Sequence, residues 1–257
     1  MKAFNRLTWA ILAFTTIPFQ MHGQQHSGAT SSNIEPEAIA ALNKMGTYLR
    51  SLKTFQVRAE TYKEDVLVDG QKIQFAGVTD LLAQAPNRLM AEVNSELEVR
   101  RYLYDGKTFT LVDPVANYYA TVPAPPTTVE LINRLEEKYG MDIPFADLFR
   151  WGGPNSRVSE ITSAEDIGPG QVGGTTCEHY AFRQPGLDWQ IWIQLGDYPL
   201  PRRIVLTTTT DEARPQFSAA YTWNLAPSFN EDTFSFTPPR DSHKIVLDET
   251  SSTAEGK

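Results

Sequence analysis

The sequence is poor in the residues that build disulfides and metal sites. Its 257 residues include one cysteine and four histidines. A single cysteine, Cys177, excludes an internal disulfide, so the fold must be stabilised by packing alone. His22, His26, His179 and His243 are too scattered for metal-ligand spacing, and no HxxxH or CxxC pair occurs. We therefore expect no metal site and no bound cofactor.

The motifs of common enzyme classes are also absent. The sequence contains no G-x-S-x-G nucleophile elbow, no P-loop and no G-x-G-x-x-G. Glu178 and His179 are adjacent in a strand-like stretch, where neighbouring side chains face opposite sides of a sheet. We interpret Cys177 as a small strand residue and residues 168–170 (Gly-Pro-Gly) as part of a loop. We predict that the chain is not an enzyme; the opposing hypothesis, an enzyme acting in an apolar cleft, rests on His179, Asp188 and the aromatic strands.

No apolar run reaches the roughly 20 residues that a membrane-spanning helix needs. Residues 7–19 are uncharged and apolar, follow Lys2 and Arg6, and precede a polar stretch. This pattern is typical of a secretory signal peptide. We expect residues 1–23 to be cleaved and the rest of the chain to be exported, with no transmembrane segment.

Positive charge is scarce as well. The 23 Lys and Arg residues are outnumbered by 31 Asp and Glu residues, which gives a net charge of −8. A surface of this sign repels phosphate backbones at long range. Nucleic acid is therefore not an expected partner.

The sequence instead contains a helix followed by alternating strands. Apolar residues recur at spacings of three and four over residues 35–51, which predicts an amphipathic helix. From residue 54 the period changes to two, and Asp-Gly pairs at 69–70 and 105–106 are typical of hairpin turns. Ten strands are expected, at residues 54–68, 71–84, 87–95, 97–104, 107–112, 117–122, 172–184, 187–195, 201–209 and 215–225.

A helical insert divides these strands into groups of six and four. Thr127 and Glu130 form a capping-box pattern at the start of a helix that ends at Gly140, and a short helix is expected from Pro144. We predict a mainly β (α+β) fold with one large curved antiparallel sheet and helices on one face; a two-layer β-sandwich is the alternative. The expected organisation is a signal peptide (1–23), a flexible tether (24–33), one folded domain (34–247) and a disordered tail (248–257).

Apolar and aromatic side chains are abundant on the expected strands. They are explained either by core packing or by a pocket for a long apolar ligand, and both need the same residue types. The cavity-lining candidates are Phe55, Val57, Leu89, Phe109, Leu111, Trp189, Ile191, Tyr221 and Trp223. The candidates for a lid over that cavity are Leu131, Leu135, Phe145 and Phe149.

Several stretches carry a family resemblance. They are residues 104–109 (YDGKTF), 113–120 (DPVANYYA), 123–125 (PAP), 143–149 (IPFADLF) and the closing 234–239 (FSFTPP). The chain resembles, over residues 35–247, a family of predicted bacterial periplasmic proteins defined by a domain of unknown function. That family is similar to the lipoprotein carriers LolA and LolB.

The resemblance implies a fold and a function. The fold would be a half-open, LolA-like antiparallel barrel whose mouth is covered by helices at 128–139 and 144–150. The function would be the binding of a lipid, or of the acyl chains of a lipoprotein, in an apolar cavity in the periplasm, as a carrier to the outer membrane. The implied partners are a lipid or an acylated protein, with transient contacts to membrane-bound partners. The alternative is a periplasmic protein-binding or envelope-sensing module with the same fold and no lipid.

Overall fold

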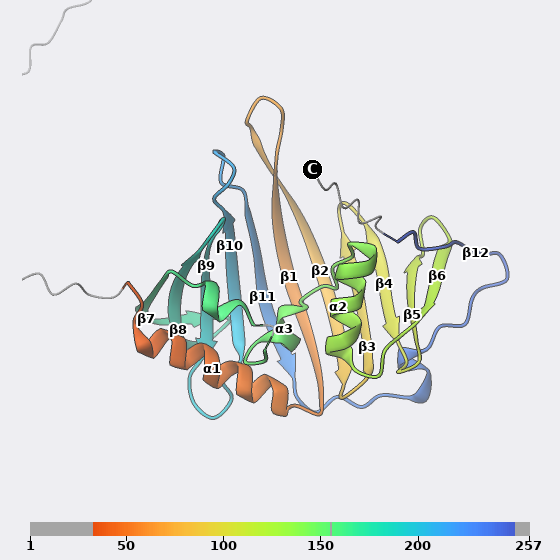
Figure 1. The fold of residues 1–257 in the computed structure, drawn as a ribbon, viewed down its shortest axis with the longest axis horizontal. Coiled ribbons are helices and arrows are strands. Elements are labelled where there is room, and N and C mark those ends of the chain that lie inside the picture. The colour runs from red at the N-terminus through yellow and green to blue at the C-terminus, as the bar shows by residue number, and fades with distance from the viewer. Residues whose placement is uncertain (1–32, 155, 250–257) are drawn as a thin grey trace, which may run out of the picture. The chain divides into compact units, whose positions relative to one another are not determined.

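Twelve strands form one continuous sheet in residues 33–154 and 156–249, the part of the chain that the computed structural model describes (Figure 1). The strand order is β12-β6-β5-β4-β3-β2-β1-β11-β10-β9-β8-β7. Every pair is antiparallel except β12 with β6. The predicted single antiparallel sheet is confirmed, and the two-layer sandwich is wrong. The expected signal peptide (1–23) and most of the expected tether and tail lie outside the described residues.

The sheet consists of two meanders that meet at its centre. The first comprises β1 (Thr54–Val66), β2 (Lys72–Gln84), β3 (Arg88–Ser95), β4 (Val99–Tyr104), β5 (Thr108–Asp113) and β6 (Tyr118–Pro123). The second comprises β7 (Ser163–Val172), β8 (Thr175–Gln184), β9 (Leu187–Gln194), β10 (Pro201–Thr208) and β11 (Gln216–Asn224). The meanders are joined by β1 and β11, which pair from Gln56 with Asn224 to Lys63 with Phe217.

The two predicted Asp-Gly turns connect strands as expected. Gly70 and Gly106 have φ angles of 84° and 93°, a region that glycine adopts without steric cost. Along β1, the buried Phe55, Val57 and Ala59 alternate with more exposed residues. One face of the sheet is therefore apolar at its centre, as the period of two predicts.

Two strands were not predicted. Residues 163–172, expected to include a loop at Gly168-Pro-Gly170, form the edge strand β7 with an irregularity between Asp166 and Gly168. An edge strand tolerates Pro169 because one row of its N–H groups has no partner strand. The two-residue strand β12 (His243–Lys244) pairs with β6 at the other edge and gave no sequence signal, because it is too short for a pattern.

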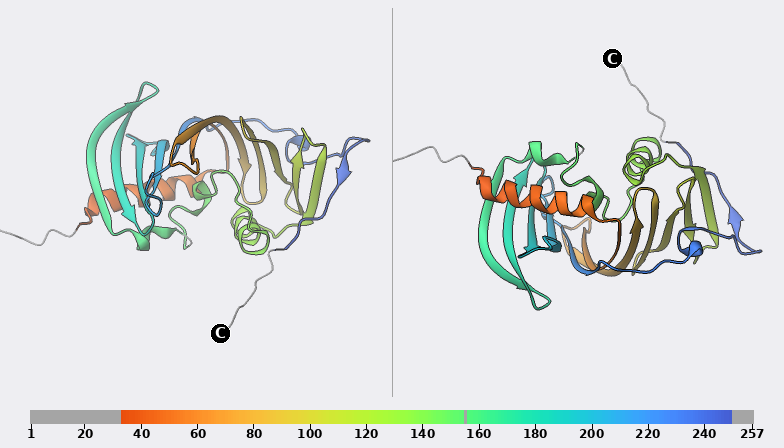
Figure 2. Two further views of the ribbon diagram at one scale, coloured as in Figure 1. Left: turned by 90° about the horizontal axis from the view of Figure 1, so that it is seen from above. Right: turned by 90° about the horizontal axis from the view of Figure 1, so that it is seen from below.

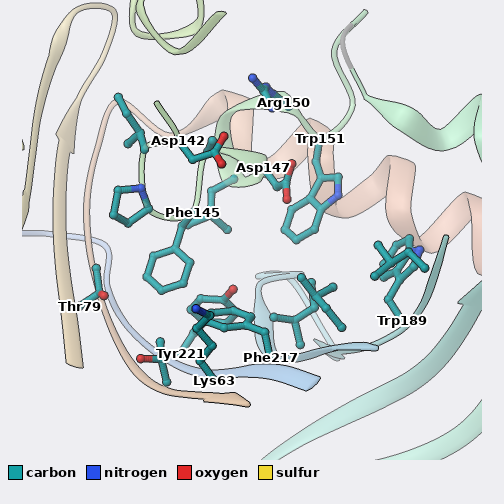
Figure 3. Close-up of a pocket in the computed structure, with 18 of the residues that line it drawn as sticks. Lys63, Thr79, Asp142, Phe145, Asp147, Arg150, Trp151, Trp189, Phe217 and Tyr221 are labelled. Carbon is teal, nitrogen blue, oxygen red and sulfur yellow. The ribbon is translucent and has the colours of Figure 1, made fainter. Parts of the chain in front are cut away.

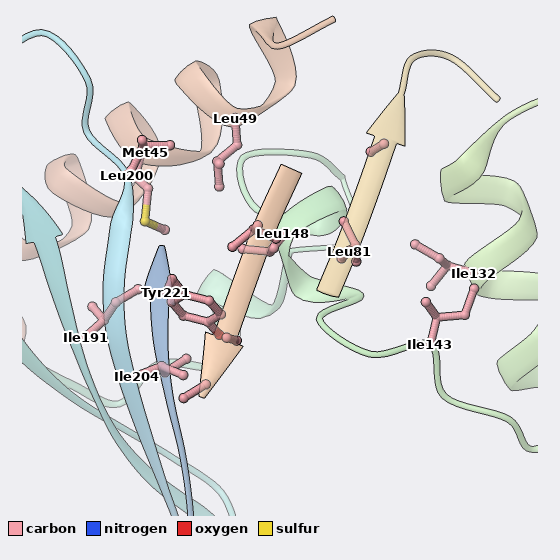
Figure 4. Close-up of a cluster of buried hydrophobic side chains, with 14 of the residues drawn as sticks. Met45, Leu49, Leu81, Ile132, Ile143, Leu148, Ile191, Leu200, Ile204 and Tyr221 are labelled. Atoms are coloured by element: carbon pink, nitrogen blue, oxygen red, sulfur yellow. The ribbon is translucent and has the colours of Figure 1, made fainter. Parts of the chain in front are cut away.

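Three helices lie on one face of the sheet, which we call the inner face; Figure 2 shows the sheet curving around it. They are α1 (Pro36–Ser51), α2 (Thr128–Tyr139) and the short α3 (Asp147–Arg150), which begins three residues later than expected. Figure 4 shows Met45 of α1 and Leu148 of α3 packed against Ile191, Ile204 and Tyr221 of the sheet. This cluster is the core that positions the helices.

The chain after β11 covers part of the opposite, outer face. It contains the 3-10 helix η2 (Glu231–Phe234), which packs on β3, and Phe234 is only 2% exposed. Phe236 contacts Tyr119 of β6 with ring centroids 5.3 Å apart. The inner face is therefore the one left for a site beneath the helices.

Candidate functional site

A cavity of about 840 Å³ lies between the inner face of the sheet and residues 141–154 and 156–161, which we call the covering segment. The covering segment contains α3 and the 3-10 helix η1 (Arg157–Glu160). Thr79, Phe217 and Tyr221 project from the sheet, and Phe145 and Asp147 project from the covering segment (Figure 3). The volume falls within the range of about 300–1,000 Å³ that is typical of small-molecule sites.

The covering segment is held at its two sides by different helices. At Gly46 of α1, a Cβ atom would lie 2.5 Å from the backbone nitrogen of Gly152, so the two backbones are in direct contact. Arg150 forms an ion pair with Glu136 of α2. The segment is therefore positioned by both α1 and α2 rather than by the sheet alone.

Phe145 is held in an unusual backbone conformation. Its φ is 57°, in the left-handed region that bulky residues rarely adopt. Its ring meets Tyr221 edge to face, with centroids 5.2 Å apart and an interplanar angle of 78°. Backbone strain of this kind is concentrated at functional sites.

The end of the cavity beside β9 is apolar. Trp189 is 7% exposed and stacks on Phe182 at a centroid distance of 4.3 Å, while its Nε1 donates to Gln184 Oε1 at 3.2 Å. Leu206 and Phe217 continue this wall toward the cavity's centre. Apart from the Gln184 amide, the side chains at this end of the cavity are apolar.

Two carboxylates of the covering segment give the cavity a polar region. Asp142 and Asp147 both line it and are solvent accessible. The surrounding protein removes water from Asp147 and so raises the pKa of its carboxyl, with Glu136 and Asp142 adding to the rise while Arg150 and Arg157 oppose it. A carboxylate in this setting gains stability from a positively charged neighbour.

Two hydroxyl groups line the cavity from the sheet. Tyr221 is 6% exposed and Thr79 is 4% exposed. Neither hydroxyl makes a hydrogen bond within the described residues, and neither oxygen is a fully buried atom, so both are open to the cavity. Burial, and secondarily the charge of Asp147, raises the pKa of Tyr221.

Three of the sequence candidates line the cavity: Trp189, Tyr221 and Phe145. The others are packed in the core beside it rather than at its surface; they are Phe55, Val57, Leu89, Phe109, Leu111, Ile191, Trp223, Leu131, Leu135 and Phe149. Trp223 donates from Nε1 to the Pro201 carbonyl at 2.8 Å and packs on Phe55, which turns it away from the cavity. That any of these residues binds a ligand stays a prediction.

The residues behind the enzyme hypothesis are not brought to the cavity. His179 bonds to Gln190 at 3.1 Å and stacks on Trp192 at 3.9 Å. Asp188 pairs instead with Arg183 at 2.8 Å and Arg214 at 2.7 Å. Among the described residues, no group of three or more His, Cys, Asp or Glu side chains could hold a metal ion, and no helix is long and apolar enough to cross a bilayer.

Sequence reasoning missed Phe217, Thr79 and the two carboxylates of the covering segment. Phe217 shares the alternation of Ala219 and Tyr221, so its face was visible in the sequence. Asp142 and Asp147 gave a weaker signal, because they interrupt an apolar stretch that has no regular period.

Comparison with known proteins gives one family and several distant folds. A family model described as "Predicted periplasmic protein (DUF2092)" matches residues 38–248. No curated protein matches the chain.

Several solved structures are similar at low identity. An uncharacterized conserved protein from Thermus thermophilus has 11% sequence identity and a TM-score of 0.47, over 82% of this chain and 99% of that one. LprF from Mycobacterium bovis has 12% identity and a TM-score of 0.44, over 82% and 99% of the two chains. A LolA superfamily protein from Nitrosomonas europaea has 10% identity and a TM-score of 0.35, over 77% and 97%.

Proposed function

This chain belongs to the DUF2092 family of predicted periplasmic proteins, as expected from the sequence, and from this premise we propose that it binds a hydrophobic ligand in the cavity under the covering segment. The ligand is a lipid or the acyl chain of a lipoprotein. The observation that carries the proposal is the cavity of about 840 Å³ with its apolar end at Trp189, Leu206 and Phe217.

The energetics favour an acyl chain as the occupant. Burying a CH₂ group is worth about 0.8 kcal/mol, so a 16-carbon chain supplies on the order of 12 kcal/mol before the costs of binding are subtracted. Those costs include the lost motional freedom of the ligand, on the order of 4–15 kcal/mol. Shielding of the chain from water therefore gives net binding wherever the cost stays below about 12 kcal/mol, and no catalytic group is needed for it.

A carrier must also release its ligand, and the covering segment is the part that would move. Gly140 and Gly152 flank the part of it that carries Phe145 and α3, and they have φ angles of 58° and 70°. Few residues other than glycine adopt this region readily, and small φ and ψ changes at such positions can swing a short segment. We expect the segment to open about these two residues when a ligand enters or leaves for a membrane or a partner.

Two measurements test the proposal. Native mass spectrometry of the protein, purified without detergent from a bacterial periplasm, should show a bound mass that fragments as a phospholipid or an acylated peptide. Titration with a bromine-labelled fatty acid should quench tryptophan fluorescence, because bromine quenches tryptophan at contact range.

The tryptophans themselves provide the matched control. Trp151 and Trp189 line the cavity, whereas Trp192 and Trp223 do not. The W151F/W189F variant should lose most of the quenching, and the W192F/W223F variant should keep it, with folding checked by circular dichroism. A folded wild-type protein that carries no lipid and shows no quenching would exclude the proposal and favour the protein-binding alternative.

A further inference from the structure

We propose that the cavity also recognises the headgroup of its ligand, and that this headgroup is zwitterionic and carries an amine, as in a phosphoethanolamine phospholipid. This inference rests on the proposed function. It assigns the ammonium group to Asp142 and Asp147 (Figure 3). It assigns the phosphate and ester oxygens to Arg157 and to the hydroxyls of Thr79 and Tyr221.

The two carboxylates have no cationic partner at bonding distance. Neither Asp142 nor Asp147 forms an ion pair or a side-chain hydrogen bond within the described residues. Two acidic groups on one wall of a cavity repel each other, and a bound ammonium group would neutralise that repulsion. Charge-assisted hydrogen bonds from an amine to carboxylates are also stronger than neutral ones.

The basic residues of the cavity are mostly committed to other partners. Lys63 pairs with Asp65 at 3.0 Å, and Arg150 pairs with Glu136. Arg157 lines the cavity and forms no ion pair within the described residues. A guanidinium group in the same cavity as two carboxylates matches a ligand that carries both a phosphate and an amine.

The hydroxyls of Tyr221 and Thr79 are independent evidence for a polar ligand atom. Both side chains are more than nine-tenths buried, both line the cavity, and neither hydroxyl has a partner within the described residues. In Figure 3 the Tyr221 hydroxyl points toward the space below Asp147, whereas Thr79 lies at the side of the cavity, beyond Phe145. Because both hydroxyl oxygens are open to the cavity, each can donate a hydrogen bond to an ester or phosphate oxygen of a bound lipid.

Purely anionic headgroups fit this region less well. Each adds negative charge beside two carboxylates in a protein whose net charge is −8. The amine of a zwitterionic headgroup offsets that repulsion.

Competition binding tests the inference. The full chain is loaded with the neutral fluorescent probe N-phenyl-1-naphthylamine, which is then displaced by three ligands with the same palmitoyl chain. These are lysophosphatidylethanolamine (zwitterionic), lysophosphatidylglycerol (anionic) and monopalmitoylglycerol (neutral). We expect the zwitterionic ligand to bind about tenfold more tightly than the anionic one, the difference that one charge-assisted contact supplies.

Isosteric variants separate the local effect from overall charge. The D142N/D147N variant should lose the preference and still bind the probe. The D197N/E212Q variant changes the net charge equally at exposed positions that do not line the cavity, and should keep the preference. If the wild type binds lysophosphatidylglycerol as tightly as lysophosphatidylethanolamine, or more tightly, the inference is overturned and the variants are not needed.

The same experiment keeps the two proposals apart. If the probe and monopalmitoylglycerol bind but no ligand is preferred, the headgroup site is wrong and the apolar cavity stands. If the neutral ligands do not bind at all, the proposed function fails, and the headgroup site fails with it.

Discussion

Gly46 and Gly152 meet backbone to backbone, because α1 crosses the covering segment at a point where neither residue carries a side chain. A Cβ atom at Gly46 would lie 2.5 Å from the Gly152 nitrogen and 2.6 Å from the Trp151 carbonyl carbon. Contacts this short are with backbone atoms, so they cannot be relieved by rotating a side chain. Tight packing between α1 and the covering segment therefore depends on this pair of glycines.

Gly46→Ala is expected to destabilise the protein. Alanine favours a helix over glycine by about 1 kcal/mol, but overpacking typically costs about 1–3 kcal/mol, so the steric cost wins here. Urea denaturation measures the difference. Gly170→Ala is the control, because a Cβ atom there would lie at an ordinary 3.5 Å from Trp192. A Gly46→Ala variant more stable than the wild type would contradict the prediction.

Phe145 gives a prediction about backbone strain. At a φ of 57°, residues with a Cβ atom pay roughly 1–2 kcal/mol that glycine does not. Phe145→Gly should therefore be more stable than Phe145→Ala by about 1 kcal/mol, the reverse of the usual order for these two residues. Equilibrium unfolding of the two variants decides it, and equal stabilities would mean that the segment relaxes once the ring is gone.

Asp147 gives a prediction about pH. Its pKa in the folded protein lies above the ordinary 3.8, mainly because neighbouring protein atoms displace part of the water around a carboxyl that still reaches solvent. Between these two pKa values the folded state binds more protons than the unfolded state, so stability falls as the pH rises through that window. The Asp147→Asn variant lacks this titration and so does not lose that stability. The difference in melting temperature, variant minus wild type, should therefore increase as the pH is raised from 3 to 7.

Asp105 should behave in the opposite way. Burial acts to raise the pKa of its carboxyl, but hydrogen bonds from Thr108 and from the Lys107 backbone hold the pKa below its ordinary value. That stability is present above the ordinary value and is lost as the pH falls through the folded pKa. The Asp105→Asn variant should therefore be destabilised, relative to the wild type, most strongly at neutral pH. If both variants show the same pH profile, the assigned causes are wrong.

Tyr104 links β4 to the proline-rich stretch before α2. Its side chain is fully buried, and its hydroxyl donates to the Pro125 carbonyl at 2.5 Å. Tyr104→Phe leaves that carbonyl without its partner and should cost about 1–3 kcal/mol of unfolding free energy. Tyr62→Phe is the control, because Tyr62 is 45% exposed. Burial raises the pKa of Tyr104 to about 12, so its ionisation should appear late in a spectroscopic titration.

The sequence predicted the strands best where turns and alternation agree. The Asp-Gly turns at Gly70 and Gly106 and the period of two placed the hairpins of the first meander within a few residues. β7 was missed because Pro169 and its two flanking glycines outweigh local strand signals, whereas the edge of a sheet tolerates them. That tolerance is a tertiary property that a single segment does not reveal.

The cavity was harder to predict than the sheet. Alternation groups Phe217, Tyr221 and Trp223 on one face, but it does not reveal that Trp223 turns toward the Pro201 carbonyl while the other two line a cavity. Asp142 and Asp147 lie on a segment without periodicity, whose path is set by contacts with α1 and α2. Residues of that kind can be found only once the packing is known.

The pairing of β1 with β11 also sets the order in which the molecule can form. Each meander is built from neighbours in sequence, but the central pairing joins residue 56 to residue 224. Contacts between such distant residues form slowly, because a long loop must close first. Thr61, Phe217 and Tyr221 line the cavity from both sides of this junction. A chain in which β11 has not yet paired with β1 has two separate meanders and an incomplete cavity. Under the proposed function, ligand binding is therefore expected to follow folding.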